Sequence, residues 1–210
     1  VSTQYNKNHF ERVIRHVDSA SGNFVVDTQY TKNDYFLLNT KYTIGFMRNN
    51  KLSARSAIRY GINTELYQPF FVDSNLLEPA FNVDVPNYKW VTRLDYRNGL
   101  HLLIQPFVQW KYALSDKLST VAGLHLQYFT LNHSFAVEPR FSLKWQIKSN
   151  QSLAFGTGLH SQMLPVYQYF LRDSMNNLYN KNLDFMRSFH VVIGYDVFFK
   201  KDIRIKAEIY

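Results

Sequence analysis

Residues 134–148 read SFAVEPRFSLKWQIK, and this stretch decides the fold. Its odd positions are mostly apolar and include Phe135, Phe141 and Trp145. Its even positions are polar and include the charged residues Glu138 and Arg140. Successive side chains of a β-strand point to opposite faces, so the alternation predicts a strand with one apolar face and one hydrated face. A helix would instead repeat its apolar residues about every 3.6 positions.

The same two-residue alternation recurs along most of the chain. It covers residues 36–47, 52–66, 101–114, 118–131, 151–163, 187–200 and 203–210. With residues 134–148 these stretches make about eight strands, several of them about 12 to 15 residues long. Strands of soluble proteins cluster near about five or six residues, whereas a tilted membrane strand needs about 9 to 11. We therefore expect an all-β fold, an antiparallel transmembrane β-barrel meander, with a soluble sandwich or lipocalin-like barrel as the alternative.

The composition argues against several other classes of protein. Of the 210 residues 46% are hydrophobic and 17% aromatic, so a disordered chain is not expected. No apolar run approaches the roughly 18 to 20 residues of a membrane-spanning helix, and Val1–His9 lack the pattern of a signal peptide. Cysteine is absent, which removes disulfides and thiolate metal sites. The formal charge of +8 is scattered along the chain, so no nucleic-acid partner is expected.

The connections between the expected strands differ in length. Short turns are expected at residues 48–50, 115–117, 149–151 and 201–202, and long loops at about 67–100 and 164–186. Outer-membrane barrels have short periplasmic turns and longer external loops, so the two long segments should be external. We assign Tyr88–Arg97, despite its alternation, to the first long loop, which closes at Asn98–Gly99. Residues 1–35 should form another external loop region with partial strand, and residues 36–210 the transmembrane barrel wall.

An open sheet is unstable in lipid, because the backbone groups at its two edges have no partners there. The strands must therefore close into a small barrel or belong to a larger one, and we expect a fragment of a larger barrel. The strand near Phe36 and the strand ending at Tyr210 should then not pair with each other. Pro139 should mark a bulge or a missing ladder bond, because proline has no N–H to donate.

Several short motifs occur in order along this alternating pattern. They are Asn50–Arg55, Trp110–Tyr112 leading into Ser115–Leu118, Ala122–His125, Leu131–Asn132, Glu138–Arg140 and Gly156–Gln162. The ordered set resembles the barrel of TonB-dependent outer-membrane receptors, in the subgroup with an N-terminal carboxypeptidase-regulatory-like domain. The resemblance extends from about Asn39 to Tyr210.

This resemblance implies a barrel of about 22 strands filled by an N-terminal plug. It also implies energy-coupled import of a scarce ligand, such as a siderophore, cofactor, glycan or peptide, across the outer membrane. The implied partners are outer-membrane lipid, the plug domain of the same full-length protein and, through the missing N-terminal part, the TonB complex. The present sequence shows no plug, TonB-contacting box or closing C-terminal strand. A passive porin or a small structural outer-membrane barrel is the alternative function.

Three histidines fall on the hydrated faces of their strands, namely His125, His160 and His190. Imidazole is a common metal ligand, but no close carboxylate pattern accompanies these residues. Hydrogen bonding in the lumen is therefore expected, and no metal site. His160 and Ser161 are adjacent and must face opposite ways, so they cannot form a catalytic pair. The chain is not expected to be an enzyme or to hold a cofactor.

The turn lengths determine which hydrated side chains are neighbours across strands. A three-residue turn at 115–117, a two-residue loop at 132–133 and a three-residue turn at 149–151 would keep the hydrated faces matched. Two lateral rows follow, one of Phe107, His125, Arg140 and His160, and the next of Gln105, Gln127, Glu138 and Gln162. Apart from Phe107, these residues are the predicted plug-facing or ligand-facing site of the lumen, and for Glu138 and Arg140 the ordinary polarity of a hydrated lumen is the equal alternative. Arg140 between two histidines should keep this site cationic and able to bind carboxylates.

Aromatic residues form two further groups. Near strand ends on the apolar face lie Trp110, Tyr112, Tyr128, Trp145, Tyr195 and Phe199, and an interfacial girdle is expected there. In the long loops lie Tyr67, Phe70, Phe71, Tyr167, Tyr169, Phe170 and Tyr179. The loop aromatics are predicted to contact the ligand, and packing within the loops is the equal alternative.

Overall fold

The computed structural model describes residues 2–17, 24–77, 89–173, 175–199 and 203–210. The strands are β1 (Ser2–Val17), β2 (Phe24–Lys51), β3 (Ser56–Leu77), β4 (Lys89–Tyr96), β5 (His101–Ala113), β6 (Leu118–Phe129), β7 (Ser134–Lys148), β8 (Gln151–Gln162), β9 (Met186–Phe199) and β10 (Ile203–Ile209). Two short 3-10 helices, η1 (Val166–Phe170) and η2 (Tyr179–Asn182), follow β8. In the part of the chain described, no helix has the length and apolar character needed to cross a membrane.

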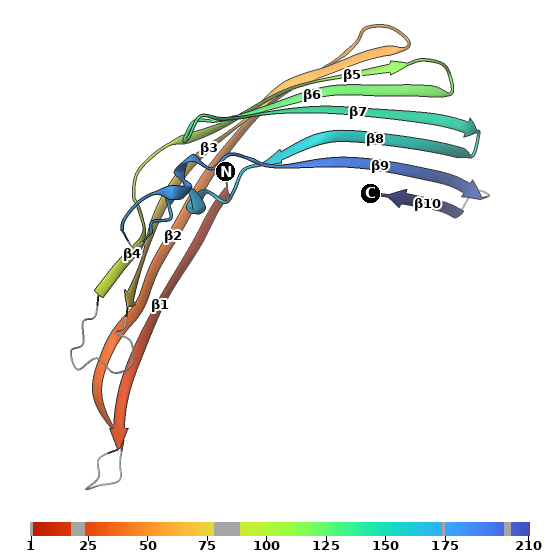
Figure 1. The fold of residues 1–210 in the computed structure, drawn as a ribbon. Coiled ribbons are helices and arrows are strands. Elements are labelled where there is room, and N and C mark those ends of the chain that lie inside the picture. The colour runs from red at the N-terminus through yellow and green to blue at the C-terminus, as the bar shows by residue number, and fades with distance from the viewer. Residues whose placement is uncertain (1, 18–23, 78–88, 174, 200–202) are drawn as a thin grey trace. The chain divides into compact units, whose positions relative to one another are not determined.

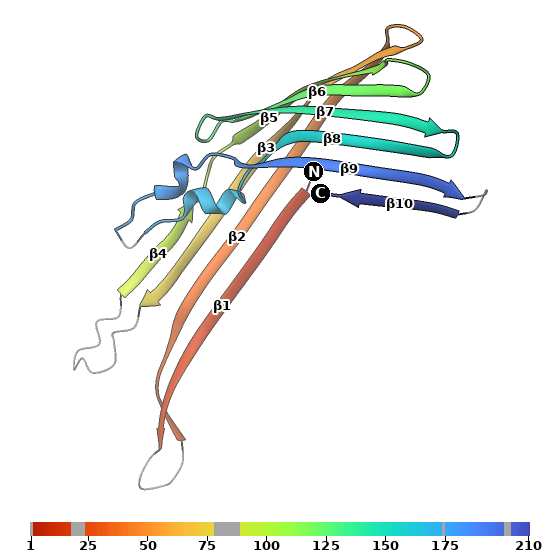
Figure 2. The same cartoon turned by 45° about the vertical axis from the view of Figure 1, so that its right-hand side comes forward.

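Hydrogen bonds join the strands into a sheet with the order β1-β2-β3-β5-β6-β7-β8-β9-β10, and β4 pairs with β3 outside this path. The described pairings are antiparallel. Because β1 and β10 are the two ends of the path, the sheet is not closed, as the sequence predicted. Figures 1 and 2 show β5 to β10 lying side by side in chain order.

The prediction of an all-β antiparallel sheet is confirmed, and each of the eight predicted stretches forms a strand. Several predicted strand limits were wrong. β3 continues to Leu77 instead of ending at Leu66, and β4 forms within Tyr88–Arg97, where it pairs with β3. Polar residues were used to place the strand ends, but cross-strand pairing carries a strand through such residues. The predicted turn at 201–202 lies outside the described residues.

The chain divides into two compact units. The first contains residues 1–42, 67–101 and 165–183, and the second contains residues 43–66, 102–164 and 184–210. β1, which is 16 residues long, lies in the first unit and occupies much of the region expected to be a loop with partial strand. The second unit contains β6 to β10, nearly all of β5 and the adjoining parts of β2 and β3.

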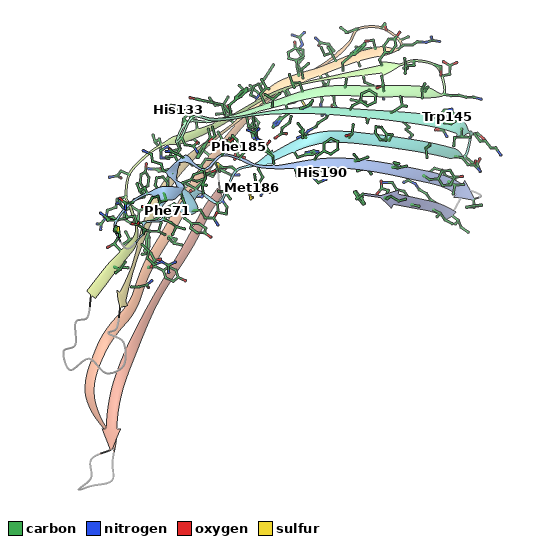
Figure 3. All side chains as sticks on the ribbon, in the orientation of Figure 1. Phe71, His133, Trp145, Phe185, Met186 and His190 are labelled. Atoms are coloured by element: carbon green, nitrogen blue, oxygen red, sulfur yellow. The ribbon has the colours of Figure 1, made fainter. Side chains whose placement is uncertain are left out.

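In the second unit the apolar face of the strands is the exposed one. Along β7, Phe135, Val137 and Phe141 are 49%, 47% and 42% exposed, whereas Ala136 and Glu138 on the opposite face are buried. The other strands of this unit expose further apolar side chains, among them Val108, Trp110, Leu124, Trp145, Phe155, Leu159, Phe189, Val191 and Ile193. A water-soluble sheet packs its apolar face on a core and hydrates its polar face, so this arrangement is the reverse. Figure 3 shows Trp145 near the end of β7 that leads into β8.

The predicted register is confirmed in the first hairpin of this unit, where β5 and β6 place Phe107 opposite His125. The turn between β2 and β3 was predicted at residues 48–50 and instead lies at 52–55. There the N–H groups of Leu52 and Ser53 donate to the Ser56 carbonyl at 2.9 and 3.0 Å. The Ser53 hydroxyl also accepts from the Arg55 N–H at 3.2 Å, and a serine that bonds the backbone in this way favours a turn.

The second hairpin is shifted by two residues from the predicted register. His125 lies opposite Glu138 rather than Arg140, because the turn between β6 and β7 spans residues 130–133. A favoured two-residue hairpin turn needs positive φ at one or both of its central residues. His133, with a φ of 58°, takes that conformation here, and Asn132 Oδ1 instead accepts from the Ser134 N–H at 3.2 Å. The longer turn results from this local bonding.

The third hairpin is also shifted by two residues. Arg140 lies opposite Gly158 rather than His160. The turn between β7 and β8 contains only residues 149 and 150, and the register changes between Gln146 and Lys148, where β7 has an irregularity. Since both shifts are even, every side chain stays on its predicted face.

Pro139 marks a break in the ladder, as predicted. β7 pairs with β6 from Ser134 to Trp145, but its pairing with β8 begins only at Arg140. Because Pro139 has no N–H to donate, the ladder between the two strands ends beside it. Residues 134–139 of β7 therefore form no regular ladder with β8, and there Glu138 binds the Ser161 N–H of β8 with its side chain instead.

Gly61 of β3 leaves no room for a side chain. A Cβ added there would lie 2.3 Å from the Phe46 carbonyl oxygen, whereas one added at Gly156 would meet nothing within 4 Å. We expect Gly61→Ala to lower the free energy of unfolding by about 1–3 kcal/mol through overpacking, and Gly156→Ala to leave it unchanged or slightly higher. Urea unfolding of both variants in detergent micelles measures this difference. Equal stability of the two variants would contradict the close approach of β2 and β3.

Candidate functional site

Glu138 is the centre of a polar cluster on the hydrated face of the second unit. β7 places it opposite His125 of β6, and its side chain is fully buried, with 0% exposed. A buried carboxylate is strongly destabilising unless hydrogen bonds and a positive charge compensate it. The neighbouring strands supply both.

Four donors converge on the two carboxylate oxygens of Glu138. Oε2 accepts from Arg140 Nη2 at 2.6 Å and from His125 Nδ1 at 3.0 Å, which requires the proton of the imidazole on Nδ1. Oε1 accepts from the Gln127 side-chain amide and, at 2.8 Å, from the Ser161 N–H. Groups on β6, β7 and β8 therefore bind one side chain. Hydrogen bonds to a charged group are about twice as strong as neutral ones, so the cluster is tightly held.

The cluster takes the place of ladder bonds beyond Pro139. The Ser161 N–H donates to Glu138, and the Ser161 carbonyl accepts from Gln127 Nε2 at 2.8 Å. Both backbone polar groups of this β8 residue are thus bound by side chains of β6 and β7. A backbone group buried without a partner is destabilising, so these two side chains hold β8 against its neighbours where a ladder is missing.

A chain of side-chain amides leads from β3 to Glu138. Asn63 Nδ2 donates to Gln105 Oε1 at 3.1 Å, and Gln105 Nε2 donates to Gln127 Oε1 at 3.3 Å. Gln127 then donates to Glu138, so each amide directs its donor toward the carboxylate. An ionised carboxylate only accepts hydrogen bonds, and this fixes the direction of the whole chain. The resulting polar stripe crosses β3, β5, β6 and β7.

The structure joins most of the predicted lumenal residues in this network. They are Gln105, His125, Gln127, Glu138 and Arg140. The predicted lateral row was wrong, because Arg140 lies opposite Gly123 and Gly158 instead of His125 and His160. A Cβ at Gly158 would lie 3.1 Å from Arg140 Cγ, so the glycine leaves space for the arginine side chain. The Arg140 side chain is 47% exposed and ion-paired with Glu138, so the charge that was expected to keep this site cationic is partly compensated.

His160 and His190 form a separate pair on the same face. Their ring centroids are 4.9 Å apart with the rings perpendicular, and Ser188 Oγ lies 2.9 Å from His190 Nε2. Gln162 lies nearby on β8, opposite Met186 of β9, and Figure 3 marks Met186 and His190. Among the described residues, no group of three or more histidine, cysteine, aspartate or glutamate side chains could hold a metal ion. Neither His160 nor Gln162 is among the described hydrogen-bond partners of Glu138, so these two predicted residues lie outside the carboxylate network.

Asn63 and Ser161 belong to the cluster and were not predicted as site residues. Asn63 lies on the hydrated side of the alternation in residues 52–66, so the same pattern that identified Gln105 could have identified it. Ser161 contributes only its backbone, and its side chain belongs to the opposite face. No residue pattern indicates a backbone contribution of this kind.

The loop aromatics lie mostly in the interior of the first unit. Tyr67, Phe71, Tyr169 and Phe170 are buried. The Phe170 ring stacks on Tyr96 with centroids 3.8 Å apart, and Phe36 and Phe70 meet edge to face at 5.6 Å. This packing matches the alternative interpretation of these residues. Tyr167 and Tyr179 are exposed, and ligand contact by the loop aromatics stays a prediction.

Removing the Glu138 carboxylate should destabilise the sheet strongly. Glu138→Ala leaves the donors of Arg140, Gln127 and Ser161 without their acceptor, and breaking a buried pair in this way costs about 3–5 kcal/mol. Glu138→Gln retains a carbonyl oxygen as an acceptor and should cost less. The control is Glu208→Ala on exposed β10, which should change the stability little. Urea unfolding compares the three variants, and equal stability of Glu138→Ala and the control would contradict this role of the cluster.

Comparisons with known proteins give no relative for this arrangement. No family model matches the chain, and neither a curated protein nor a solved structure matches it. The basis for a functional proposal is therefore the chain itself, namely its polar cluster, its exposed apolar face and the order of its motifs.

Proposed function

We propose that this chain is part of the barrel wall of a TonB-dependent outer-membrane receptor, which imports a scarce ligand by energy-coupled transport. The observation that carries the proposal is the exposed apolar face of a long-stranded antiparallel sheet, opposite a face that is polar and hydrogen-bonded. The ordered motifs that resemble this receptor family favour it over other outer-membrane barrels. In this proposal the chain lies in the outer membrane.

Lipid is the environment that best fits the exposed face. Apolar side chains such as Val137, Phe189 and Ile193 are about half or more exposed, and burying one of this kind gains about 1.5–3 kcal/mol. Soluble monomers seldom expose a contiguous apolar patch larger than a few hundred Å². In the second unit the exposed apolar residues continue over β5 to β9. Acyl chains would cover this face, with Trp110 and Trp145 near the strand ends at headgroup depth.

The hydrated face would line the lumen and meet the plug domain of the same full-length protein. Arg140 has five N–H donors, and the exposed part of its guanidinium is available beyond the bond to Glu138. Guanidinium groups bind carboxylates through two parallel hydrogen bonds, so an acidic plug side chain or a carboxylate of the ligand fits this position. The TonB complex would act on the plug, and the wall would hold the plug through contacts of this type.

A charge on the exposed apolar face should oppose insertion into lipid. We expect Phe141→Arg to make the free energy of folding into phospholipid vesicles less favourable by about 2–4 kcal/mol, because an arginine near the bilayer midplane faces hydrocarbon. The control is Ser142→Arg, the next residue on the opposite, hydrated face, which should change this free energy by less than about 1 kcal/mol. Urea titration of both variants in vesicles gives the comparison. A wild-type protein that stays folded and monomeric in buffer without lipid or detergent would refute the membrane location.

Loss of the Arg140 guanidinium should impair transport. We expect Arg140→Ala in the full-length protein to reduce energy-dependent uptake about tenfold at equal surface level, as removal of one charge-assisted contact to the plug or ligand predicts. Lys148→Ala, at the exposed end of the same strand, is the control and should leave uptake unchanged. Radiolabelled siderophore, corrinoid, glycan and peptide probes are assayed with and without a protonophore. Uptake that persists with the protonophore would indicate a passive pore and contradict the proposal.

A further inference from the structure

A pocket lies beside the turn that joins β2 to β3 in the second unit. Its volume is about 650 Å³, and it is lined by the end of β2, residues 53–59 and the end of β5. Lys51, Arg55, Arg59 and Lys111 all contribute to its lining. No aspartate or glutamate lines it. The pocket therefore gathers four positive charges from three segments of the chain.

These four cations are almost uncompensated. In the described residues, Lys51, Arg59 and Lys111 have no carboxylate oxygen within 4.0 Å, and Arg59 instead donates to Met47 Sδ at 3.0 Å. Arg55 is 3.7 Å from Asp116, whose side chain is 96% exposed, so that ion pair is weak. Like charges held near one another repel, so this arrangement favours an anion in the pocket.

Other cations of the same unit are treated differently. Arg140, Arg187, Arg204 and Lys206 each have a carboxylate partner on their own or a neighbouring segment. Among the described residues of this unit, Arg48, Lys144 and Lys148 also have no carboxylate oxygen within 4.0 Å, so what distinguishes the pocket is that four cations line one place.

The pocket also supplies neutral hydrogen-bond donors. The Ser53 hydroxyl oxygen accepts from the Arg55 N–H at 3.2 Å, so the hydrogen of this hydroxyl can still be donated. Asn50 Oδ1 accepts from Arg48 Nε at 3.0 Å just before the turn. These bonds, together with those to the Ser56 carbonyl, hold the turn in one conformation. The donors are thus in place before a ligand binds.

We propose that this pocket binds a phosphate-bearing ligand that carries two or more negative charges. Arginine forks and lysine ammonium groups are the side chains that recognise phosphate oxygens, and hydroxyl and amide donors complete their coordination. A group of the size of pyrophosphate fits the volume with water to spare. A soluble phosphate ester and the headgroup of an anionic phospholipid share this chemistry. The inference does not depend on the chain being a transport receptor.

Titration with sodium pyrophosphate tests the soluble source. The protein is purified in a zwitterionic detergent, and binding is followed by isothermal titration calorimetry at low ionic strength. The variant Arg59→Gln/Lys111→Gln should lose at least about tenfold in affinity, because each removed cation loses a charge-assisted hydrogen bond. The control variant Lys148→Gln/Lys181→Gln removes the same charge from two exposed positions outside the pocket and should bind within about twofold of wild type. Urea unfolding confirms that both variants fold.

A second arm tests the lipid source with nanodiscs of phosphatidylcholine containing or lacking phosphatidylglycerol. Pyrophosphate binding that depends on Arg59 and Lys111 supports a soluble ligand, and phosphatidylglycerol retention that depends on the same residues supports a lipid headgroup. Absence of both in the wild-type protein would overturn the proposal. Equal losses in the pocket variant and the control would overturn it as well, since they would reflect total charge alone. Tighter binding of a polyglutamate peptide than of pyrophosphate would replace phosphate with an acidic polypeptide.

Discussion

The burial of a single carboxylate organises the hydrated face of the sheet. Pro139 removes a backbone donor within β7, and the strand does not pair with β8 before Arg140. Glu138, directly before the proline, bonds the Ser161 N–H instead, and it can stay buried because Arg140, His125 and Gln127 compensate its charge. The same carboxylate is the final acceptor of the amide chain that starts on β3. One side chain thus couples the break in the ladder to the polar order of the neighbouring strands.

The alternation of side chains between the two faces of a strand explains which parts of the fold the sequence could predict. A shift of two residues between paired strands leaves every side chain on its face, whereas a shift of one would reverse all of them. The alternation therefore predicts strands, faces and an even register, and all three are present. It does not choose among even registers, because turn chemistry makes that choice. At residues 130–133 the conformation of His133 and the bonds of Asn132 selected a longer turn, and Glu138 took the place opposite His125 that Arg140 was expected to fill.

The same limit applies to the candidate site. Gln105, Gln127 and Glu138 could be predicted as neighbours because all lie on the hydrated faces of adjacent strands, but their hydrogen-bond partners depend on the register. The backbone of Ser161 entered the cluster only because the ladder breaks at Pro139, and no residue pattern shows that. In the loops, Tyr167 and Tyr169 are alike in sequence, yet η1 turns one outward and buries the other. Burial there depends on the packing of segments far apart in the chain, which local sequence does not encode.

Positive charge has different consequences at two places on the second unit. Around Glu138 the carboxylate already accepts from four donors, and the Arg140 side chain, which is 47% exposed, is the more accessible of its two charged or titratable donors. A saturated network of this kind resists displacement and stiffens the strands it joins. At the turn between β2 and β3, an anion would relieve repulsion among Lys51, Arg59 and Lys111, and among the described residues it would break no ion pair of these three cations. The hydrogen-bonded network therefore stiffens the strands around Glu138, whereas the proposed anion site lies at the turn between β2 and β3, where four cations line one pocket.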